Sequence, residues 1–183
     1  MIKFLKTCKL LSCSQFKGKD WTQRGPLKKL KFNTMEAHYY NVEVNWKTAR
    51  KGFICALEMN QKNGICIEVA TPPEFPHGIP GIWSPEHLFT AAVSSCLMTT
   101  FLAVAENSKL SFVSFSCKSK GKLEQIDGKF MMSEIFLEPV VTITDEKDRE
   151  RAERVLQKSE AACLISNSVK SKITMVSAIK ISK

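Results

Sequence analysis

The sequence has few of the features that mark secreted, membrane-spanning or zinc-binding proteins. In residues 1–34 the longest purely aliphatic run is Leu10-Leu11, far short of a secretory signal or a membrane span. The seven cysteines include no Cys-x-x-Cys pair and no Cys/His cluster with zinc-ligand spacing. These absences argue against secretion, against a membrane span in this segment and against structural zinc.

The number of cysteines is odd. Without a secretory signal, this argues against a disulfide scaffold and for a reducing compartment, where thiols are either packed or reactive. Cys55 and Cys66 flank the first predicted turn and are able to face each other, but we interpret them, like Cys117, as packed or idle strand residues. We expect a cytoplasmic protein, with organelle targeting by the N-terminal segment left open.

The net charge of +9 is concentrated at one end of the chain. Residues 1–34 carry nine Lys or Arg and the single acid Asp20, whereas residues 35–183 carry eighteen bases and seventeen acids. A balanced surface of this kind argues against nucleic-acid binding by the folded part. For residues 1–34 three interpretations stay open: a disordered basic tail, a targeting presequence, or an over-extended reading frame whose real start is Met35. The excess of Lys over Arg favours the first and third.

Hydrophobic periodicity predicts six strands in residues 35–183, which we take as one domain. Alternation at 40–46 and apolar runs at 53–59 and 65–69, the last two joined by a turn at Asn63-Gly64, predict a three-stranded antiparallel meander. Two further strands, 112–124 and 129–144, meet at the hairpin dipeptide Asp127-Gly128, and a final strand covers 173–181.

Two helices are predicted between these strands. Residues 72–85 hold five of the seven prolines and form a stiff loop that ends at Ser84-Pro85-Glu86, a helix start with an N-cap. The helix runs to about Asn107 and is apolar on most sides, so we expect it to be buried. Asp145 caps a second helix, with Ala152, Val155, Leu156 and Ser159 turned inward. The predicted order is βββ-α-ββ-α-β, an α+β fold.

Two motifs resemble the OsmC/Ohr family of osmotically inducible and organic hydroperoxide resistance proteins. They are SPEHLFTAAVSSC at 84–96 and CLISNSVK at 163–170, and the loop ATPPEF at 70–75 resembles one branch of the family. The resemblance covers roughly residues 38–181. It implies an OsmC-like fold with a long buried central helix, an intertwined homodimer and a thiol-dependent peroxidase.

The resemblance also implies the site residues. Cys96 would be the attacking thiol and Cys163 the resolving thiol, by way of a sulfenic acid and then a disulfide. The attacking sulfur must be a thiolate, and burial alone works against its ionisation. Arg50 resembles the family's active-site arginine, which stabilises the thiolate, with Lys51 as the fallback. Glu86 would hold the Arg50 guanidinium as a charged pair.

Helix geometry bears on how these residues meet. Ten helical residues separate Glu86 from Cys96 by about 15 Å and rotate them by roughly 280°, so they cannot touch on one straight helix. Either the first turn bends away, or Glu86 reaches the cysteine of a second subunit. The second alternative agrees with the family's dimers, and we predict an obligate homodimer.

The remaining expectations concern the substrate and cofactors. The resemblance implies organic hydroperoxides bound in an apolar pocket, reduction by an external dithiol such as a lipoylated protein, and no metal, haem or flavin. The candidate pocket residues are Phe75, Ile82, Trp83, Phe89 and Met98. One departure from many family members is Leu164, which stands where proline often follows the second cysteine. The alternative function is a noncatalytic dimeric carrier of small ligands, or a thiol redox sensor.

Overall fold

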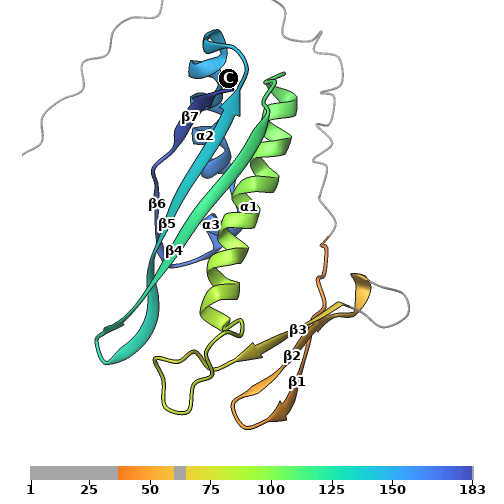
Figure 1. Ribbon diagram of the computed structural model, residues 1–183, viewed down its shortest axis with the longest axis vertical. Helices are drawn as coiled ribbons and strands as arrows, with labels where there is room; N and C mark the ends of the chain where they lie inside the picture. The colour runs from red at the N-terminus through yellow and green to blue at the C-terminus, as the bar shows by residue number, and fades with distance from the viewer. Residues whose placement is uncertain (1–36, 60–64, 183) are drawn as a thin grey trace, which may run out of the picture. The chain divides into compact units, whose positions relative to one another are not determined.

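The computed structural model describes residues 37–59 and 65–182, and all the elements below lie in the unit Tyr40–Lys183 (Figure 1). The strands are β1 Glu43–Thr48, β2 Lys51–Ala56, β3 Ile65–Ala70, β4 Ser114–Ile126, β5 Lys129–Ile143, β6 Lys172–Met175 and β7 Ala178–Ile181. The helices are α1 Pro85–Asn107, α2 Arg149–Ala162 and α3 Leu164–Ser168, with 3-10 turns η2 at Leu57–Met59 and η3 at Glu146–Asp148. The predictions for residues 1–34 and for the turn at Asn63-Gly64 lie outside the described residues.

The first three strands form the predicted antiparallel meander, in the order β1-β2-β3. The loop after β3 is tied back to this sheet by main-chain hydrogen bonds. Ala70 N–H donates to the Trp83 carbonyl (2.8 Å), and Thr71 N–H donates to the Arg50 carbonyl (3.0 Å). The sheet therefore holds the turn at Arg50 and the residue just before the α1 N-cap.

Cys55 and Cys66 form a disulfide, so our interpretation of both as packed or idle residues is wrong. The physical reason is the register of the β2–β3 ladder, which sets the two residues directly opposite each other with their Cα atoms 4.1 Å apart. Their presence on facing strands was visible in the sequence, but the register was not. The disulfide also counts against the argument for a reducing compartment that was drawn from the odd number of cysteines.

Helix α1 begins where the Ser84-Pro85-Glu86 signal predicts. Ser84 is the N-cap, Pro85 is the first helical residue, and the Ser84 hydroxyl accepts a hydrogen bond from the His87 N–H (3.3 Å). The His87 imidazole completes a capping box, with its Nδ1 2.8 Å from the Ser84 hydroxyl oxygen. The helix then continues without interruption to Asn107, as predicted.

The second sheet contains β4, β5, β6 and β7, and the other three strands all pair with β5. The β4–β5 hairpin turns at Asp127 (φ 51°) and Gly128 (φ 77°), the two positive angles that the hairpin dipeptide predicts. The predicted single strand over 173–181 is instead two strands, β6 and β7, each parallel to β5. The break lies at Val176, whose N–H donates to the Leu137 carbonyl.

The second helix begins slightly later than predicted. The Asp145 side chain accepts a hydrogen bond from the Lys147 N–H, but it caps the 3-10 turn η3, which leads into α2. The inward side of α2 is the predicted set of Ala152, Val155, Leu156 and Ser159, all buried. The short helix α3, which follows Cys163, was not predicted, because five residues are too few to show helical periodicity.

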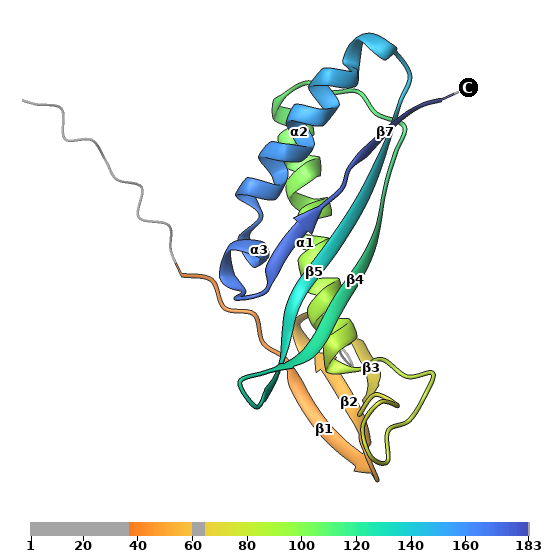
Figure 2. The same ribbon diagram turned by 90° about the vertical axis from the view of Figure 1, so that its left-hand side faces the viewer.

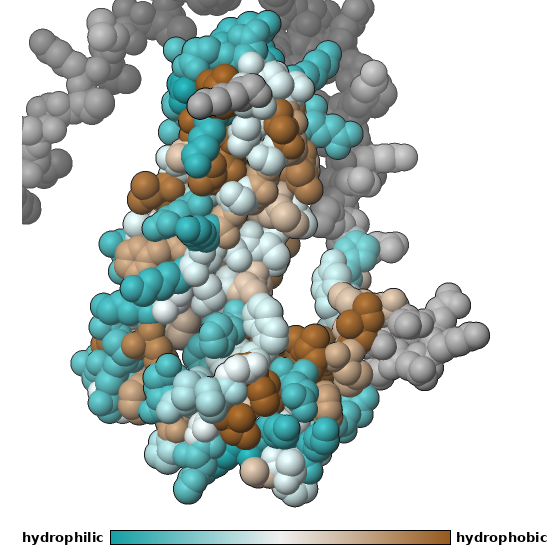
Figure 3. Space-filling model, in the orientation of Figure 1, coloured by the Kyte–Doolittle hydropathy of each residue, from teal (hydrophilic) through white to brown (hydrophobic). Residues whose placement is uncertain are grey.

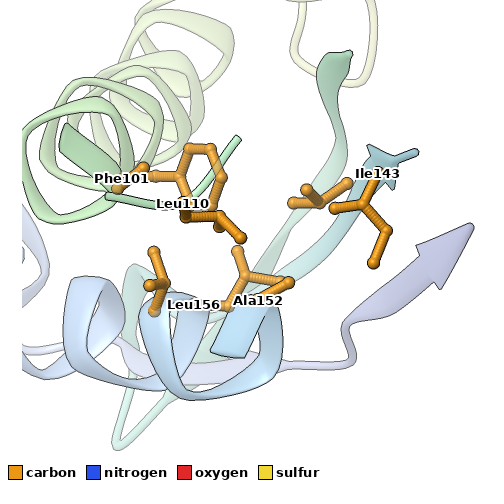
Figure 4. Packing of buried hydrophobic residues seen from close by; sticks show 8 residues of the cluster. Phe101, Leu110, Ile143, Ala152 and Leu156 are labelled. Carbon is orange, nitrogen blue, oxygen red and sulfur yellow. The ribbon is translucent and has the colours of Figure 1, made fainter. Parts of the chain in front are cut away.

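The core lies between the helices and the β4–β5 sheet (Figure 2). One cluster brings Phe101 of α1 together with Leu110, Ile143 of β5, and Ala152 and Leu156 of α2 (Figure 4). A second cluster joins α1 to β5 and contains Val93, Leu97, Ile135 and Leu137. The tight fit of α1 against β4 explains Gly121, because a Cβ at this position would lie 2.3 Å from the Thr90 hydroxyl.

We expected α1 to be buried, but within one chain only one stripe of its surface is buried. Val93, Leu97, Phe101 and Ala105 are buried, whereas Met98 and Leu102 are 39% and 44% exposed. Every residue of β1 is exposed as well. Apolar residues, coloured brown, lie among hydrophilic ones on the face drawn in Figure 3. By length and composition α1 could also span a membrane, a test that core helices of soluble proteins pass too.

Removing the Cys55–Cys66 disulfide should destabilise the first sheet. No residue of β1, β2 or β3 belongs to either core cluster, and the disulfide closes a loop with a sequence separation of 11. We expect the variant Cys55→Ala/Cys66→Ala to lower the free energy of opening the β2–β3 ladder by about 3 kcal/mol. Amide hydrogen exchange would show faster exchange in β2 and β3 and unchanged exchange in β4 and β5. Equal protection of β2 and β3 in both proteins would contradict this expectation.

Candidate active site

The structure brings Cys96 and Cys163 together, although they lie far apart in the sequence. Cys96 is in the middle of α1, and its Sγ accepts a hydrogen bond from the Ile165 N–H of α3 at 3.4 Å. Cys163 occupies the junction between α2 and α3, fully buried, and its thiol hydrogen-bonds to Cys96. The spatial proximity that a resolving pair requires is therefore present within one chain.

The environment of Cys96 favours its thiolate. Burial raises the pKa of the Cys96 thiol, but donated hydrogen bonds outweigh burial and hold the pKa below its ordinary value. The groups that lower the pKa of Cys96 are, in order of decreasing effect, the Ile165 N–H, the Cys163 thiol, the Thr100 hydroxyl and the Leu164 N–H. All four are uncharged, so within one chain hydrogen bonding rather than a nearby cation lowers the pKa of this thiol.

The environment of Cys163 has the opposite effect. Burial raises the pKa of the Cys163 thiol above its ordinary value, and the neighbouring Cys96 sulfur raises it further. Cys96 is therefore the more readily ionised thiol of the pair, and Cys163 the less readily ionised one. The opposite pKa shifts distinguish the two roles. Cys96 is the candidate nucleophile, and Cys163 is the candidate resolving thiol.

Glu86 lies in the first turn of α1 and lines a pocket of about 970 Å³. Its Oε2 atom is buried and has no hydrogen-bond partner among the residues that the structure describes. Since α1 is one uninterrupted helix, Glu86 and Cys96 lie on different faces, as the ten-residue spacing predicts. The first turn does not bend away, which removes that alternative. A buried carboxylate oxygen without a donor is unfavourable, and a further group is needed to satisfy it.

Arg50 lies in the exposed turn between β1 and β2. It lines a groove of about 300 Å³ together with Pro85, the residue before Glu86. No ion pair joins Arg50 to any other described residue, and no hydrogen bond joins it to Cys96. The fallback residue, Lys51, lies 3.5 Å from Glu68 and so already has an anionic partner. The roles of Arg50 and Glu86 stay predictions.

The large pocket lies between α1, the proline-rich loop and the β4–β5 hairpin. Two of the five predicted pocket residues, Phe75 and Trp83, line it. Phe75 also makes an edge-to-face contact with Phe130 at the start of β5, with ring centroids 5.6 Å apart. Cys96 is not among the lining residues of this pocket.

The other three predicted pocket residues lie elsewhere. Phe89 packs against the Val93–Leu97 core cluster, Met98 lies on the exposed face of α1, and Ile82 does not contribute to the pocket wall. Within residues 37–59 and 65–182, no group of three or more His, Cys, Asp or Glu side chains could hold a metal ion. The expectation that no cofactor is needed stays a prediction.

Sequence reasoning missed the donors that hold the Cys96 sulfur. Thr100 follows Cys96 at the i+4 spacing of a helix face, which is a signal that could have found it. The N–H groups of Leu164 and Ile165 carry no such signal, because every residue other than proline has a main-chain N–H.

Comparison with known proteins agrees with this architecture. The family model described as OsmC-like protein matches residues 78–177, more than half of the chain. The chain belongs to the OsmC-like family. The protein YmaD of Bacillus subtilis is 21% identical over 144 residues, which cover 77% of this chain and 93% of YmaD.

Solved structures of OsmC-like proteins share the fold. An OsmC-like protein of unknown function from Vibrio cholerae has a TM-score of 0.66 at 22% identity, covering 77% of this chain and 99% of that one. An organic hydroperoxide resistance protein from Elizabethkingia anophelis, with thiocyanate bound, has a TM-score of 0.61 at 20% identity, covering 80% and 100%. At these identities the likeness is one of fold. It accounts for α1 as the long central helix of the OsmC-like fold.

The two thiols should react at different rates with iodoacetamide. Thiolates are the reactive form, so we expect Cys96 to be alkylated with a pH midpoint below that of an ordinary thiol, about 8.5. Cys163, buried and protonated, should be alkylated much more slowly at neutral pH. Peptide mass spectrometry after timed alkylation distinguishes the two sites, and Cys117 serves as the internal reference. Equal rates at Cys96 and Cys117 across the pH range would contradict the expectation.

Proposed function

We propose that this OsmC-like protein is a thiol-dependent peroxidase that reduces organic hydroperoxides. The observation that carries the proposal is the contact between Cys96, whose environment favours the thiolate, and Cys163, whose environment favours the thiol. An attacking and a resolving sulfur need this division of roles. The family membership supports the same chemistry, since organic hydroperoxide resistance proteins share the fold.

The first step is attack of the Cys96 thiolate on the distal oxygen of the hydroperoxide. The S–O bond forms as the O–O bond breaks, and the leaving alkoxide takes up a proton to give the alcohol. Cys96 is then a sulfenic acid. In the second step Cys163 loses its proton and attacks the Cys96 sulfur, forming the S–S bond and releasing the hydroxyl as water. An external dithiol then reduces the disulfide and is itself oxidised.

Arg50 and Glu86 are proposed to complete the site in a homodimer. The unpartnered Glu86 oxygen lacks a donor, and the Arg50 guanidinium lacks an anionic partner among the described residues. The exposed side of α1 and the exposed strand β1 leave apolar surface for a second copy to cover. In the dimer the Arg50–Glu86 pair would lie against Cys96 of the partner subunit and polarise the peroxide.

The substrate class is inferred from the side chains that line the pocket near Glu86. Phe75, Trp83 and Phe130 give the pocket an apolar character, which suits an alkyl or aryl hydroperoxide better than hydrogen peroxide. The chemistry as written uses only sulfur and an external dithiol, with a lipoylated protein as one candidate donor, and requires no metal, haem or flavin. A cytoplasmic location stays part of this proposal.

Substitution of either cysteine should separate the two steps. With cumene hydroperoxide and a lipoyl dithiol or thioredoxin as reductant, Cys96→Ser should lose turnover entirely, because no thiolate remains to attack. Cys163→Ser should consume one equivalent of peroxide per chain and accumulate a sulfenic acid that dimedone traps at Cys96. Cys117→Ser is the matched control and should keep turnover. Wild-type turnover by Cys96→Ser would overturn the proposal.

If each site is shared between two subunits, two inactive variants should complement each other. Glu86→Ala and Cys96→Ser are each expected to be inactive as homodimers. In their heterodimer one site would combine an intact Cys96 with an intact Glu86 from the other chain. Refolding an equal mixture should therefore recover about a quarter of the wild-type activity. If a mixture proved to contain heterodimers recovers no activity, the site is not shared between subunits. A stable monomer at micromolar concentration, measured by sedimentation, would also overturn the shared site.

A carrier of small apolar ligands is the second candidate, and one observation favours it. The large pocket beside Glu86 is not lined by Cys96 within the chain, so a ligand held there need not reach the thiolate. Such a carrier would bind hydroperoxide analogues stoichiometrically without turnover. The same steady-state assay therefore distinguishes the two functions.

A further inference from the structure

Arg50 lies in a tight turn, and hydrogen bonds hold the peptide groups on both sides of it. The turn is the two-residue loop Ala49-Arg50 between β1 and β2. The Ala49 carbonyl, just before Arg50, accepts a hydrogen bond from the Trp46 indole N–H at 3.1 Å. The Arg50 carbonyl accepts one from the Thr71 N–H at 3.0 Å. Peptide groups are planar, so fixing the two that flank a Cα atom fixes both of its dihedral angles. These two donors therefore set the direction in which the Arg50 side chain leaves the backbone.

The turn needs such support because Ala49 is in the left-handed region, with φ 46°. A residue with a Cβ atom is disfavoured in this region, so the conformation persists only where other contacts hold it. Glycine would adopt it without this cost, yet position 49 is alanine. The hydrogen bond from Trp46 is made to the carbonyl of the strained residue itself. It therefore stabilises the turn at the point where the backbone is least favourable.

Packing within the chain does not explain the Trp46 side chain. It is 77% exposed and belongs to neither core cluster. The residue opposite it on β2 is Gly52, which offers no side chain as a cross-strand neighbour. Glycine is required there, because a Cβ at position 52 would lie 2.3 Å from the Asn45 carbonyl oxygen. The hydrogen bond to the turn is thus a specific contact of this exposed indole.

The other cations of this turn have an anionic partner, whereas Arg50 has none among the described residues. Lys47 and Lys51 both approach the Glu68 carboxylate, at 3.8 and 3.5 Å. Arg50 instead lines the groove of about 300 Å³ that reaches Pro85, the first residue of α1. Its backbone is held while its guanidinium is available to an anion from outside the described part of the chain.

We propose that Trp46 is a positioning residue for Arg50: its indole N–H holds the Ala49 carbonyl and so directs the guanidinium to the site shared with a second subunit. The inference deepens the proposed peroxidase, and the role of Arg50 at Cys96 rests on that proposal. The effect of Trp46 on the turn does not. Since Trp46 contributes one neutral hydrogen bond, its loss should change the population of the held turn by about threefold to tenfold.

The first measurement concerns the turn alone and uses the full chain. Trp46→Phe removes the indole N–H and keeps an aromatic ring. Order parameters from nuclear spin relaxation of the backbone amides of Ala49, Arg50 and Lys51 should fall in this variant, while those of β4 and β5 stay unchanged. Replacement of Trp46 by benzothienylalanine, in which sulfur takes the place of the N–H in a ring of the same shape, should reproduce the fall. Wild-type order parameters in the benzothienylalanine protein would overturn the proposal.

The second measurement tests whether Trp46 acts through Arg50. Alkylation of Cys96 by iodoacetamide is followed against pH in the wild type, Trp46→Phe, Arg50→Ala and the double variant. Because a nearby cation favours a thiolate, Trp46→Phe should slow alkylation below the midpoint by about threefold to tenfold, and Arg50→Ala should slow it more. The double variant should match Arg50→Ala. The proposal is wrong if Trp46→Phe causes the same loss when residue 50 is alanine.

A control and the shared design keep the outcomes distinct. Tyr40→Phe, a change at another exposed aromatic residue, should match the wild type in both measurements, and sedimentation checks that the variants have the same oligomeric state. Neither measurement needs peroxide or reductant. Falling order parameters and a non-additive double variant, in a chain that never turns over hydroperoxide, would sustain this inference and refute the proposed function. Turnover in a chain whose turn does not respond to Trp46→Phe would do the reverse.

Discussion

The packing of one stripe of α1 onto the β4–β5 sheet is the constraint on which the site depends. Val93, Leu97, Phe101 and Ala105 recur every four residues and are all buried, which fixes the rotation of the helix about its axis. With that rotation set, Cys96 points to the α2–α3 junction and Glu86 points into the large pocket. A shift of the stripe by one residue would rotate the helix by about 100° and separate Cys96 from its donors.

The same helix is also the basis of the proposed dimer. Its other side, with Met98 and Leu102, is exposed, as is all of β1. The polar counterpart of this apolar surface is the Glu86 Oε2 atom and the Arg50 guanidinium, neither of which has a partner of opposite charge among the described residues. A second copy that covered the apolar face and paired these charges would satisfy both needs at once, which is why we propose the dimer and the shared site together.

The cysteines show how neighbours, rather than residue type, decide chemistry. Cys55 meets Cys66 across a ladder and forms a disulfide, whereas Cys117 faces the core from β4 and stays a free thiol. Cys96 accepts a main-chain hydrogen bond from Ile165 and its pKa is lowered, whereas burial raises the pKa of the Cys163 thiol. Burial opposes ionisation at both sites, and the number of donors decides the outcome.

Local features of the sequence were sufficient to predict the start of α1 at Ser84, the β4–β5 turn at Asp127-Gly128 and the inward face of α2. Each depends on a cap, a dipeptide or a periodicity that acts over a few residues. The prediction of the last strand was wrong in one respect, since this segment is divided into two strands at Val176. The division arises because β6 and β7 pair with two different parts of β5. The motifs also identified Cys96 and Cys163 as a candidate pair, but only through resemblance to a family.

The sequence by itself determined the order of the strands and long helices from β1 to α2, and the ten-residue separation of Glu86 and Cys96 on one helix. It therefore also determined that these two side chains diverge. Only the tertiary structure decided what Cys96 meets. The Ile165 N–H comes from a residue 69 positions away and is a main-chain group of a kind that all non-proline residues share, so no local pattern encodes it. The Cys55–Cys66 disulfide was likewise decided by the register of two strands, a property of their pairing rather than of either strand alone.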